Sequence, residues 1–181
     1  MKKWLNTIFA GVASLFTFIF MALPAWTMKT KATGGFSLEK KFNGYQLISG
    51  KIEGEKIFEE IGAWKLYRVF AIILIVLAVV LALYAVFTLL VNLEVVKLDA
   101  KVVDLIGNVV LSLTVVVSII ALVACMRIND GAAKEMGTTV KEIKEYYSKF
   151  GTQVGLWLVT VFNVLACACA WTFSFVGKKS K

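Results

Sequence analysis

Residues 69–91 read VFAIILIVLAVVLALYAVFTLLV and contain no charged side chain. A helix needs about 20 predominantly apolar residues to cross the hydrocarbon core of a bilayer. This stretch therefore predicts a transmembrane helix, and it decides the class of fold in which the rest of the chain is interpreted.

Three further apolar stretches meet the same length requirement, namely residues 4–26, 105–126 and 154–176. The chain is 59% apolar, whereas globular proteins are roughly 45–50% apolar. The predicted fold for residues 1–181 is a single all-α membrane domain, a bundle of four transmembrane helices. Residues 92–101 leave room only for a short inner hinge, so the second and third helices are expected to be antiparallel neighbours.

The first apolar stretch shares some features with a cleaved signal peptide. Lys2 and Lys3 precede it, and Ala22-Leu23-Pro24-Ala25 faintly resembles a processing site. Its apolar run is long for a signal peptide, however, and the leucine is large for the position where a small residue is needed. We expect the segment to remain as the first transmembrane helix.

The distribution of basic residues bears on orientation. With both termini in the cytoplasm, seven Lys or Arg residues fall inside and thirteen outside, which is the reverse of the positive-inside rule. The inner segments are short and dense in lysine, and the outer loops contain nine acidic residues beside their basic ones. The first helix, which usually dominates orientation, follows two lysines. We therefore expect a cell-membrane protein with both termini in the cytoplasm.

The first outer loop, residues 27–66, is β-rich in pattern. Three alternating runs are separated by glycine-containing pairs, in the order 27–32, Gly34-Gly35, 36–42, Asn43-Gly44 and 45–49. Asn-Gly between alternating runs is a strong hairpin signal, because both central residues of the turn need a positive φ. The loop is predicted to form a small extracellular antiparallel β-sheet, a meander of three strands. Helical spacing then resumes at Ile57, Ile61 and Trp64.

The predicted sheet has two unequal faces. The apolar face needs cover, because a lone meander is barely stable in water, and the helix bundle or the second outer loop is expected to supply it. The apolar residues of this face are Met28, Phe36, Leu38, Phe42, Tyr45 and Leu47. Charged residues alternate onto the opposite face. The lysines of the loop form a candidate basic interaction surface, composed of Lys29, Lys31, Lys40 and Lys41.

The second outer loop, residues 127–152, is predicted to be an amphipathic helix that is interrupted softly around Gly137. Apolar residues recur in it at intervals of three and four, at Ala133, Met136, Val140, Ile143, Tyr147 and Phe150. Two roles stay open. The helix extends the third transmembrane helix and packs against the sheet, or it presents a docking face to a partner.

Polar residues inside the predicted spans are few and uncharged. Asn108, Ser112 and Ser118 lie in the third span, and Asn163 lies near the middle of the fourth. Each can hydrogen-bond a neighbouring helix, and we expect this structural role; lining a pore is the alternative. The absence of charge near a midplane counts against an ion-coupled transporter that works through buried carboxylates.

The composition provides little for catalysis. The chain contains no histidine, which excludes Ser-His and Cys-His pairs and histidine metal sites. Cys125 is expected at the outer end of its helix, and Cys167 and Cys169 in the inner half of theirs, too far apart for a disulfide. We predict a protein that is not an enzyme, with no catalytic, cofactor-binding or metal-binding residues.

The net charge of +8 raises the question of nucleic acid. The lysines are interleaved with acidic residues in loops and tails, and no basic face with stacking aromatic residues is formed. Anionic lipid headgroups at the membrane surface are the expected contact of the basic tails. Nucleic acid is therefore not an expected partner.

Short residue matches accompany this ground plan. The first span ends in Ala22-Leu23-Pro24-Ala25-Trp26, Arg68 enters the second span, and residues 151–169 carry a Gly-Leu-Trp and two cysteines. In topology and at these places the chain resembles the claudin and peripheral-myelin-protein superfamily, whose claudins have Ala-Leu-Pro-x-Trp and an arginine at corresponding places. Claudins also carry a Trp, Gly-Leu-Trp and two-cysteine signature in the first outer loop, and residues 27–66 contain no cysteine. The resemblance implies a claudin-like fold, and paracellular sealing is not inferred from it.

From these observations we expect a non-enzymatic multi-pass membrane protein. It would act through interactions of its extracellular sheet with a second copy of the chain or with another membrane protein, in contact with membrane lipid. The alternative is a subunit of an oligomeric pore or transporter, in which Asn108, Ser112 and Asn163 face a shared lumen.

Overall fold

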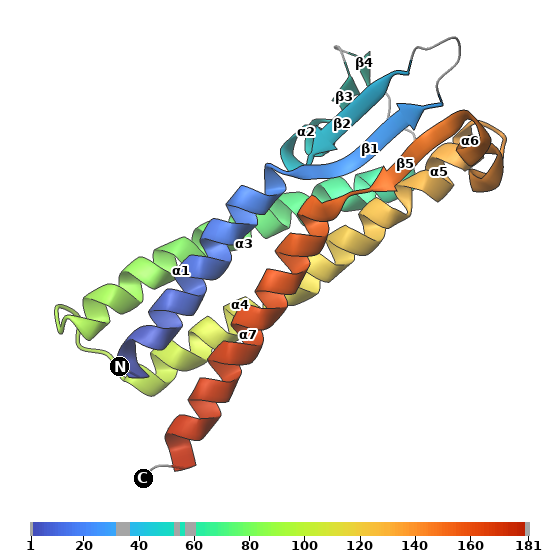
Figure 1. Ribbon diagram of the computed structural model, residues 1–181. Coiled ribbons are helices and arrows are strands. Elements are labelled where there is room, and N and C mark those ends of the chain that lie inside the picture. The colour runs from blue at the N-terminus through green and yellow to red at the C-terminus, as the bar shows by residue number, and fades with distance from the viewer. Residues whose placement is uncertain (1, 32–36, 53–54, 57–60, 180–181) are drawn as a thin grey trace.

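The computed structural model describes residues 2–31, 37–52, 55–56 and 61–179. Four long helices form a bundle, and a small sheet stands at one end of it (Figure 1). Each of the four is long and apolar enough to cross a membrane. The helices are α1 (Lys2–Met21), α3 (Gly62–Asn92), α4 (Ala100–Met126) and α7 (Val154–Lys179).

The four helices are arranged in a closed ring. α1 packs against α3 and α7, and α4 packs against the same two helices. The end that carries the sheet is called here the sheet end, and the end with the α3–α4 connection, residues 93–99, is called the loop end. α1 begins and α7 ends on the side of the loop end (Figure 1).

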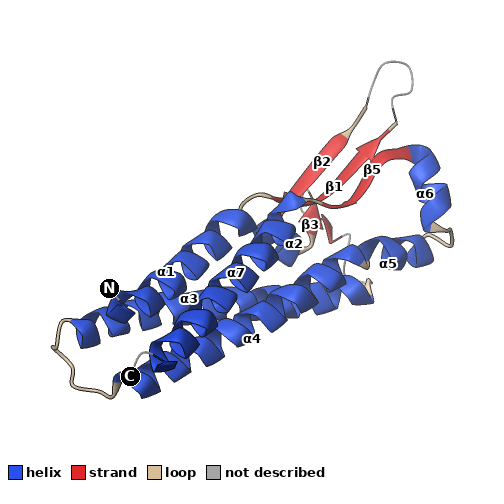
Figure 2. Cartoon of the chain, turned by 60° about the horizontal axis from the view of Figure 1, so that its bottom comes forward, coloured by secondary structure: helices blue, strands red, loops and turns tan. Residues whose placement is uncertain are grey.

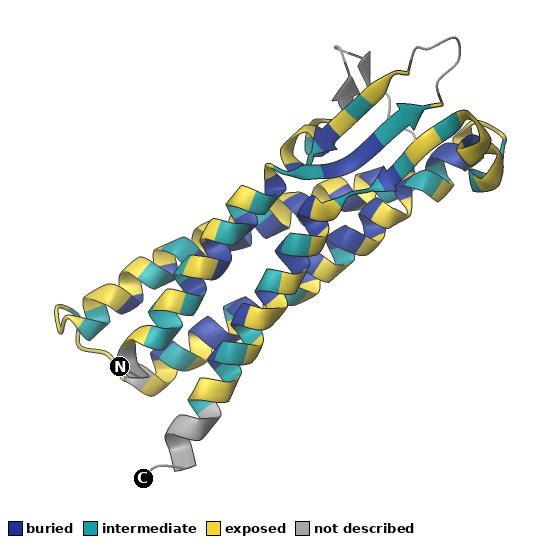
Figure 3. Cartoon of the chain, viewed as in Figure 1, coloured by how far each residue is buried: buried dark blue, intermediate teal, exposed yellow. Residues whose placement is uncertain are grey.

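Burial within the bundle follows one stripe along each helix (Figure 3). On α3 this stripe includes Ala71, Leu74, Ala78 and Leu81, all completely buried, and the two alanines let the neighbouring backbones approach closely. The remaining faces expose large apolar side chains along the length of the bundle. Apolar surface of this kind is what helices in lipid require and what helices in water avoid.

The first helix is shorter than predicted. α1 ends at Met21, and Pro24–Thr30 form the strand β1, so the expectation of one helix over residues 4–26 is wrong at its carboxyl end. The backbone N–H groups of Ala22 and Leu23 bond to carbonyls three residues back, which tightens the last turn. Pro24 then cannot continue a helix, and it biases the residue before it toward extended geometry.

The sheet has the strand order β2-β1-β5, with both pairs antiparallel (Figure 2). β1 and β2 (Glu39–Asn43) correspond to the first two predicted strands. The third strand is β5 (Tyr147–Thr152), which the sequence pattern had placed in a helix. The prediction of a small antiparallel sheet is confirmed, but the meander is wrong, because a strand from the second loop completes the sheet.

Residues 45–49, predicted as the third strand, belong instead to the helix α2 (Gly44–Ser49). Asn43 caps this helix: its side chain accepts a hydrogen bond from the Gln46 N–H at 2.8 Å, and the Gln46 side chain accepts one from the Asn43 N–H at 3.1 Å. This reciprocal capping box satisfies two backbone donors at the start of a helix. The Asn-Gly pair therefore starts a helix here rather than turning a hairpin.

α2 ends at Gly50, whose φ of 65° is the left-handed geometry common after a helix. A short hairpin follows, formed by β3 (Lys51–Ile52) and β4 (Glu55–Lys56). The predicted turn at Gly34-Gly35, together with Phe36 and Ile57, lies outside the described residues.

The second loop contains two short helices before its strand, α5 (Ile128–Glu135) and α6 (Val140–Tyr146). They are separated near Gly137, which has a φ of 63°, so the predicted interruption is confirmed. Ala133 and Ile143 are buried, as the amphipathic pattern predicts, but Met136 of the same predicted seam is 59% exposed. The pattern fails from Tyr147 onward, because the free edge of β1 offers that segment a ladder of backbone partners.

The α1–β1 and β5–α7 junctions lie against each other. The Gln153 N–H bonds to the Ala25 carbonyl at 2.7 Å, and α7 begins one residue later. A Cβ atom on Gly155 would lie 2.9 Å from the backbone oxygens of Phe20, Leu23 and Pro24. Only glycine lets the start of α7 pack this closely on the end of α1.

We predict that Gly155→Ala lowers the free energy of unfolding by about 1–3 kcal/mol, the usual cost of overpacking. The methyl group would press on three backbone oxygens, which cannot rotate away as a side chain can. The midpoint of unfolding in a dodecyl sulfate titration, followed by circular dichroism, measures the change. Gly62→Ala is the matched control, because nothing lies within 4 Å of its added methyl group. Equal midpoints for the two variants would contradict the close approach.

Candidate functional site

An aromatic cluster attaches the sheet to the bundle. Trp26, on β1, is only 2% exposed, and its indole N–H donates to Asn129 Oδ1 on α5 at 2.9 Å. Its ring centroid lies 5.8 Å from that of Phe42 on β2 and 5.0 Å from that of Phe150 on β5. Trp26 thus contacts all three strands and α5. The three strands and α5 therefore cover its ring.

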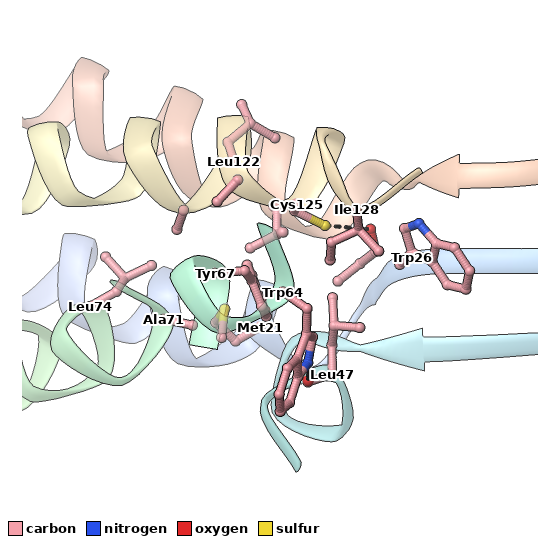
Figure 4. Close-up of a cluster of buried hydrophobic side chains, with 14 of the residues drawn as sticks. Met21, Trp26, Leu47, Trp64, Tyr67, Ala71, Leu74, Leu122, Cys125 and Ile128 are labelled. Atoms are coloured by element: carbon pink, nitrogen blue, oxygen red, sulfur yellow. Dashed lines mark hydrogen bonds between the residues drawn. The ribbon is translucent and has the colours of Figure 1, made fainter. Parts of the chain in front are cut away.

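A second group of contacts attaches α2 to α3. The Trp64 indole N–H donates to the Leu47 carbonyl at 2.7 Å, and the Tyr67 hydroxyl donates to the Gly44 carbonyl at 3.1 Å. Figure 4 shows Trp64, Tyr67 and Leu47 in one buried cluster with Met21 at the end of α1. A Cβ on Gly50 would lie 2.3 Å from the Trp64 ring, so the ring occupies the space that this glycine leaves.

The residues of the claudin resemblance at the end of the first span and the start of the second lie around this attachment. Ala22 and Leu23 link α1 to β1, Pro24 begins β1, and Trp26 fills the space beneath the sheet. Arg68 is exposed on α3, with its guanidinium carbon 5.4 Å from the centroid of a Trp64 ring. Such a contact is a cation–π interaction, worth about 0.5–1 kcal/mol at exposed sites. These residues have structural roles in this chain.

We predict that Trp26→Phe lowers the free energy of unfolding by about 1–3 kcal/mol, because it leaves the Asn129 oxygen without its buried donor. Trp157→Phe serves as the control, since that tryptophan is exposed on α7. The same detergent titration compares the two variants. A loss for Trp157→Phe as large as that for Trp26→Phe would mean that the hydrogen bond to Asn129 contributes little.

Charged side chains gather on one face of the sheet. The Lys29 ammonium lies 3.3 Å and the Lys41 ammonium 3.1 Å from the Glu39 carboxylate. Contacts with Lys41 and then Lys29 hold the pKa of Glu39 below its ordinary value of 4.5. Lys149 on β5 stands opposite Lys29 in the register of the strands. This face, formed by Lys29, Glu39, Lys41 and Lys149, is called here the charged face.

The four lysines of the predicted interaction surface do not form one surface. Lys29 and Lys41 share the charged face, whereas Lys40 alternates onto the other face of β2. Lys31 is exposed just beyond β1, and its backbone N–H bonds to the Tyr146 carbonyl at 2.8 Å. Lys149 was missed, because its segment had the pattern of a helix. Residues 147–150, Tyr-Ser-Lys-Phe, show no strict alternation of apolar and polar residues that could have indicated a strand.

We predict that the Glu39 carboxyl titrates with a midpoint below 4.5 and that Lys41→Gln moves this midpoint upward. Because the pKa is lowered by folding, the ion pairs contribute stability above pH 4.5, and that stability is lost as the pH falls through the folded-state pKa. Carbon-13 NMR of the side-chain carboxyl group measures the midpoint directly. Lys144→Gln on α6 is the control, and an equal shift in that variant would contradict a local ion pair.

The end of the sheet farthest from the bundle exposes two large side chains. Leu38 is 71% exposed and Tyr146 is 73% exposed. The Thr30 N–H bonds to the Leu38 carbonyl, and the Lys31 N–H bonds to the Tyr146 carbonyl, so the two residues flank the end of β1 from opposite sides. We call Leu38, Lys31 and Tyr146 the sheet tip. Tyr146 was not among the residues predicted for a site.

Three of the four polar residues predicted within the spans bond through their side chains to neighbouring helices, whereas the Ser118 hydroxyl donates to the Val115 carbonyl of its own helix at 2.8 Å. Asn163 is 1% exposed and its amide donates to Thr17 Oγ1 on α1 at 3.3 Å. Asn108 donates to Ser174 Oγ on α7 at 2.9 Å. Ser112 accepts a hydrogen bond from the Trp171 indole at 3.0 Å. These bonds join α1 and α4 to α7, which is the structural role expected of them.

No group of three His, Cys, Asp or Glu side chains in the described part of the chain is placed to hold a metal ion. Cys125 lies at the sheet end of α4, Cys167 and Cys169 lie in the half of α7 toward the loop end, and all three are free thiols.

Compared with protein families, curated proteins and solved structures, the chain matches none of them. Its four apolar helices and its small three-stranded antiparallel sheet are compatible with a claudin-like layout. The class that the fold defines is therefore a four-helix protein of membrane type with a sheet at one end.

Proposed function

We propose that this chain is a non-enzymatic, multi-pass cell-membrane protein that acts through its sheet. The sheet binds a second copy of the chain or another membrane protein, and both termini lie in the cytoplasm. The four helices anchor the sheet in lipid and hold it at the outer surface. Their exposed apolar side chains support this anchoring role, because such a surface is stable only when lipid or protein covers it.

The sheet tip is the observation that carries the proposal. If the helices span the bilayer, the tip stands at the far end of the sheet, away from the lipid. Contact with lipid, which accounts for the exposed apolar side chains of the helices, therefore does not account for the exposed leucine and tyrosine of the tip. Tyrosine is enriched among the residues that dominate binding energy at protein interfaces. Lys31 lies between them, so the tip combines apolar contact with positive charge.

The attachment of the sheet supports a role in binding. Trp26 joins the three strands to α5, and the β1–β5 pair is continuous with α1 and α7. A binding surface held this way loses little conformational freedom when a partner docks, which favours affinity. The charged face beside the tip adds Lys29, Lys41 and Lys149, which would favour a partner with acidic groups.

The alternative of a pore subunit has less support. It requires Asn108, Ser112 and Asn163 to face a lumen shared between copies. In this chain the three side chains make hydrogen bonds within the bundle, and Asn163 is buried. We therefore favour binding through the sheet.

The test is native mass spectrometry of the full chain, gently extracted from its own membranes. We expect a fixed stoichiometry with a second copy or with a different membrane protein. Leu38→Asp and Tyr146→Asp should each weaken that association by about tenfold or more, equivalent to about 1.4 kcal/mol, because a carboxylate would be desolvated at the interface.

Val95→Asp is the matched control, because Val95 is 69% exposed but lies at the loop end. It should leave the association unchanged. A plain monomer in gentle extraction, or equal loss of association for Val95→Asp and Leu38→Asp, would overturn binding through the sheet tip.

A further inference from the structure

A cavity at the loop end is not used by the proposed function. It has a volume of about 730 Å³ and lies between the start of α1, the end of α3, the start of α4 and the loop that joins α3 to α4. This volume is within the usual range of small-molecule sites, about 300–1,000 Å³. Its polar lining includes Asn6, Thr88, Asn92, Glu94, Lys97 and Asp104.

Hydrogen bonds between helices hold the wall of the cavity in place. The Asn6 amide on α1 donates to Asp104 Oδ1 on α4 at 2.6 Å. Thr7 on α1 donates to Thr88 Oγ1 on α3 at 2.8 Å, and Asn92 on α3 donates to Thr7 Oγ1 at 3.3 Å. Three helices therefore fix the positions of the polar groups, and the cavity is formed before any ligand binds.

Two carboxylates at the cavity, those of Asp104 and Glu94, form no ion pair within the described part of the chain. Asp104 is half-buried and takes its hydrogen bond from a neutral amide. Asp99 also lines the cavity, with its carboxylate bonded to the Lys101 N–H at the start of α4. Among the described lining residues, three carboxylates thus stand against the one ammonium of Lys97. A partly buried carboxylate is stabilised by an opposite charge, so the cavity favours a cationic group.

The arrangement favours an organic ammonium group over a metal ion. Among the described residues no three acidic, histidine or cysteine side chains are placed to share a metal. The lining also includes Val91 and Val103, which suit a carbon chain. Lys97 suits a phosphate next to the ammonium group. An ammonium, a phosphate and an apolar stem together describe the headgroup of an aminophospholipid.

We propose that the loop-end cavity binds a primary ammonium group, with Asp104 as its main anion, and that the ammonium belongs to a phospholipid headgroup. The cavity lies where the apolar helices end, which is the depth of the headgroups if the bundle spans a bilayer. A primary ammonium can donate hydrogen bonds to a carboxylate, and such charge-assisted bonds are among the strong ones. A quaternary ammonium has no N–H to donate.

The experiment compares dioleoyl-phosphatidylethanolamine with dioleoyl-phosphatidylcholine. The full chain is reconstituted in nanodiscs with equal amounts of both lipids, released into mild detergent, and its retained lipid is counted by native mass spectrometry. We expect retention of the ethanolamine lipid to exceed that of the choline lipid by about tenfold. Asp104→Asn should abolish the preference, while its new amide oxygen can still accept the hydrogen bond from Asn6.

Two further variants keep the test decisive. Asp130→Asn makes the same change at an exposed position of α5 at the sheet end, and it should retain the full preference. Glu94→Gln changes an exposed loop residue and should reduce the preference even if Asp104→Asn proves poorly folded. An unchanged preference in a folded Asp104→Asn, or in Glu94→Gln where Asp104→Asn does not fold, would overturn the proposal.

Excess ethanolamine distinguishes the two sources of the ammonium group. If it displaces a selectively retained ethanolamine lipid in an Asp104-dependent way, the lipid headgroup is the ligand. If ethanolamine binds with the same dependence but the lipids are retained equally, the ammonium site stands and its ligand is a soluble amine. If neither probe binds in an Asp104-dependent way, the cavity is not an ammonium site.

Discussion

The antiparallel pairing of β1 with β5 is the interaction on which the rest of this structure depends. β1 continues α1, and β5 leads into α7, so pairing the strands also sets the two helices side by side. The close approach at Gly155 follows from the same geometry. With β5 in place, Trp26 gains both Phe150 and Asn129 as neighbours, and the sheet becomes continuous with the bundle.

Charged groups that the structure describes are concentrated at the two ends of the bundle. The two ends differ in whether their carboxylates form ion pairs. At the sheet end, Glu39 is held between two lysines, so its charge is neutralised locally. At the loop end, Asp104 and Glu94 border a cavity and form no ion pair with another described residue. The apolar length between the ends carries only neutral polar side chains, and these serve as bonds between helices. The charged groups of the described residues therefore lie at the ends of the bundle.

The Asn43-Gly44 pair is an example of a local sequence pattern that is compatible with two structures. The same two residues suit a tight hairpin and a helix start, because asparagine both tolerates a positive φ and caps a helix. Gln46, three residues on, completes a capping box, and Trp64 and Tyr67 bond to carbonyls of the resulting helix. Those two contacts come from another helix, so the local sequence could not reveal that they would decide the outcome.

The sequence by itself determined the four apolar helices, the tight connection between α3 and α4, the antiparallel β1–β2 pair and the lysines and glutamate that share its charged face. These depend on length, hydropathy and alternation, which are local properties. The tertiary structure alone decided that residues 147–152 complete the sheet, that Trp26 is buried, that Leu38 and Tyr146 lie at the same end of the sheet and that Asp104 borders a cavity. Each of these joins segments far apart in the sequence. Contacts between such segments do not change the hydropathy pattern of either segment, so the pattern could not predict them.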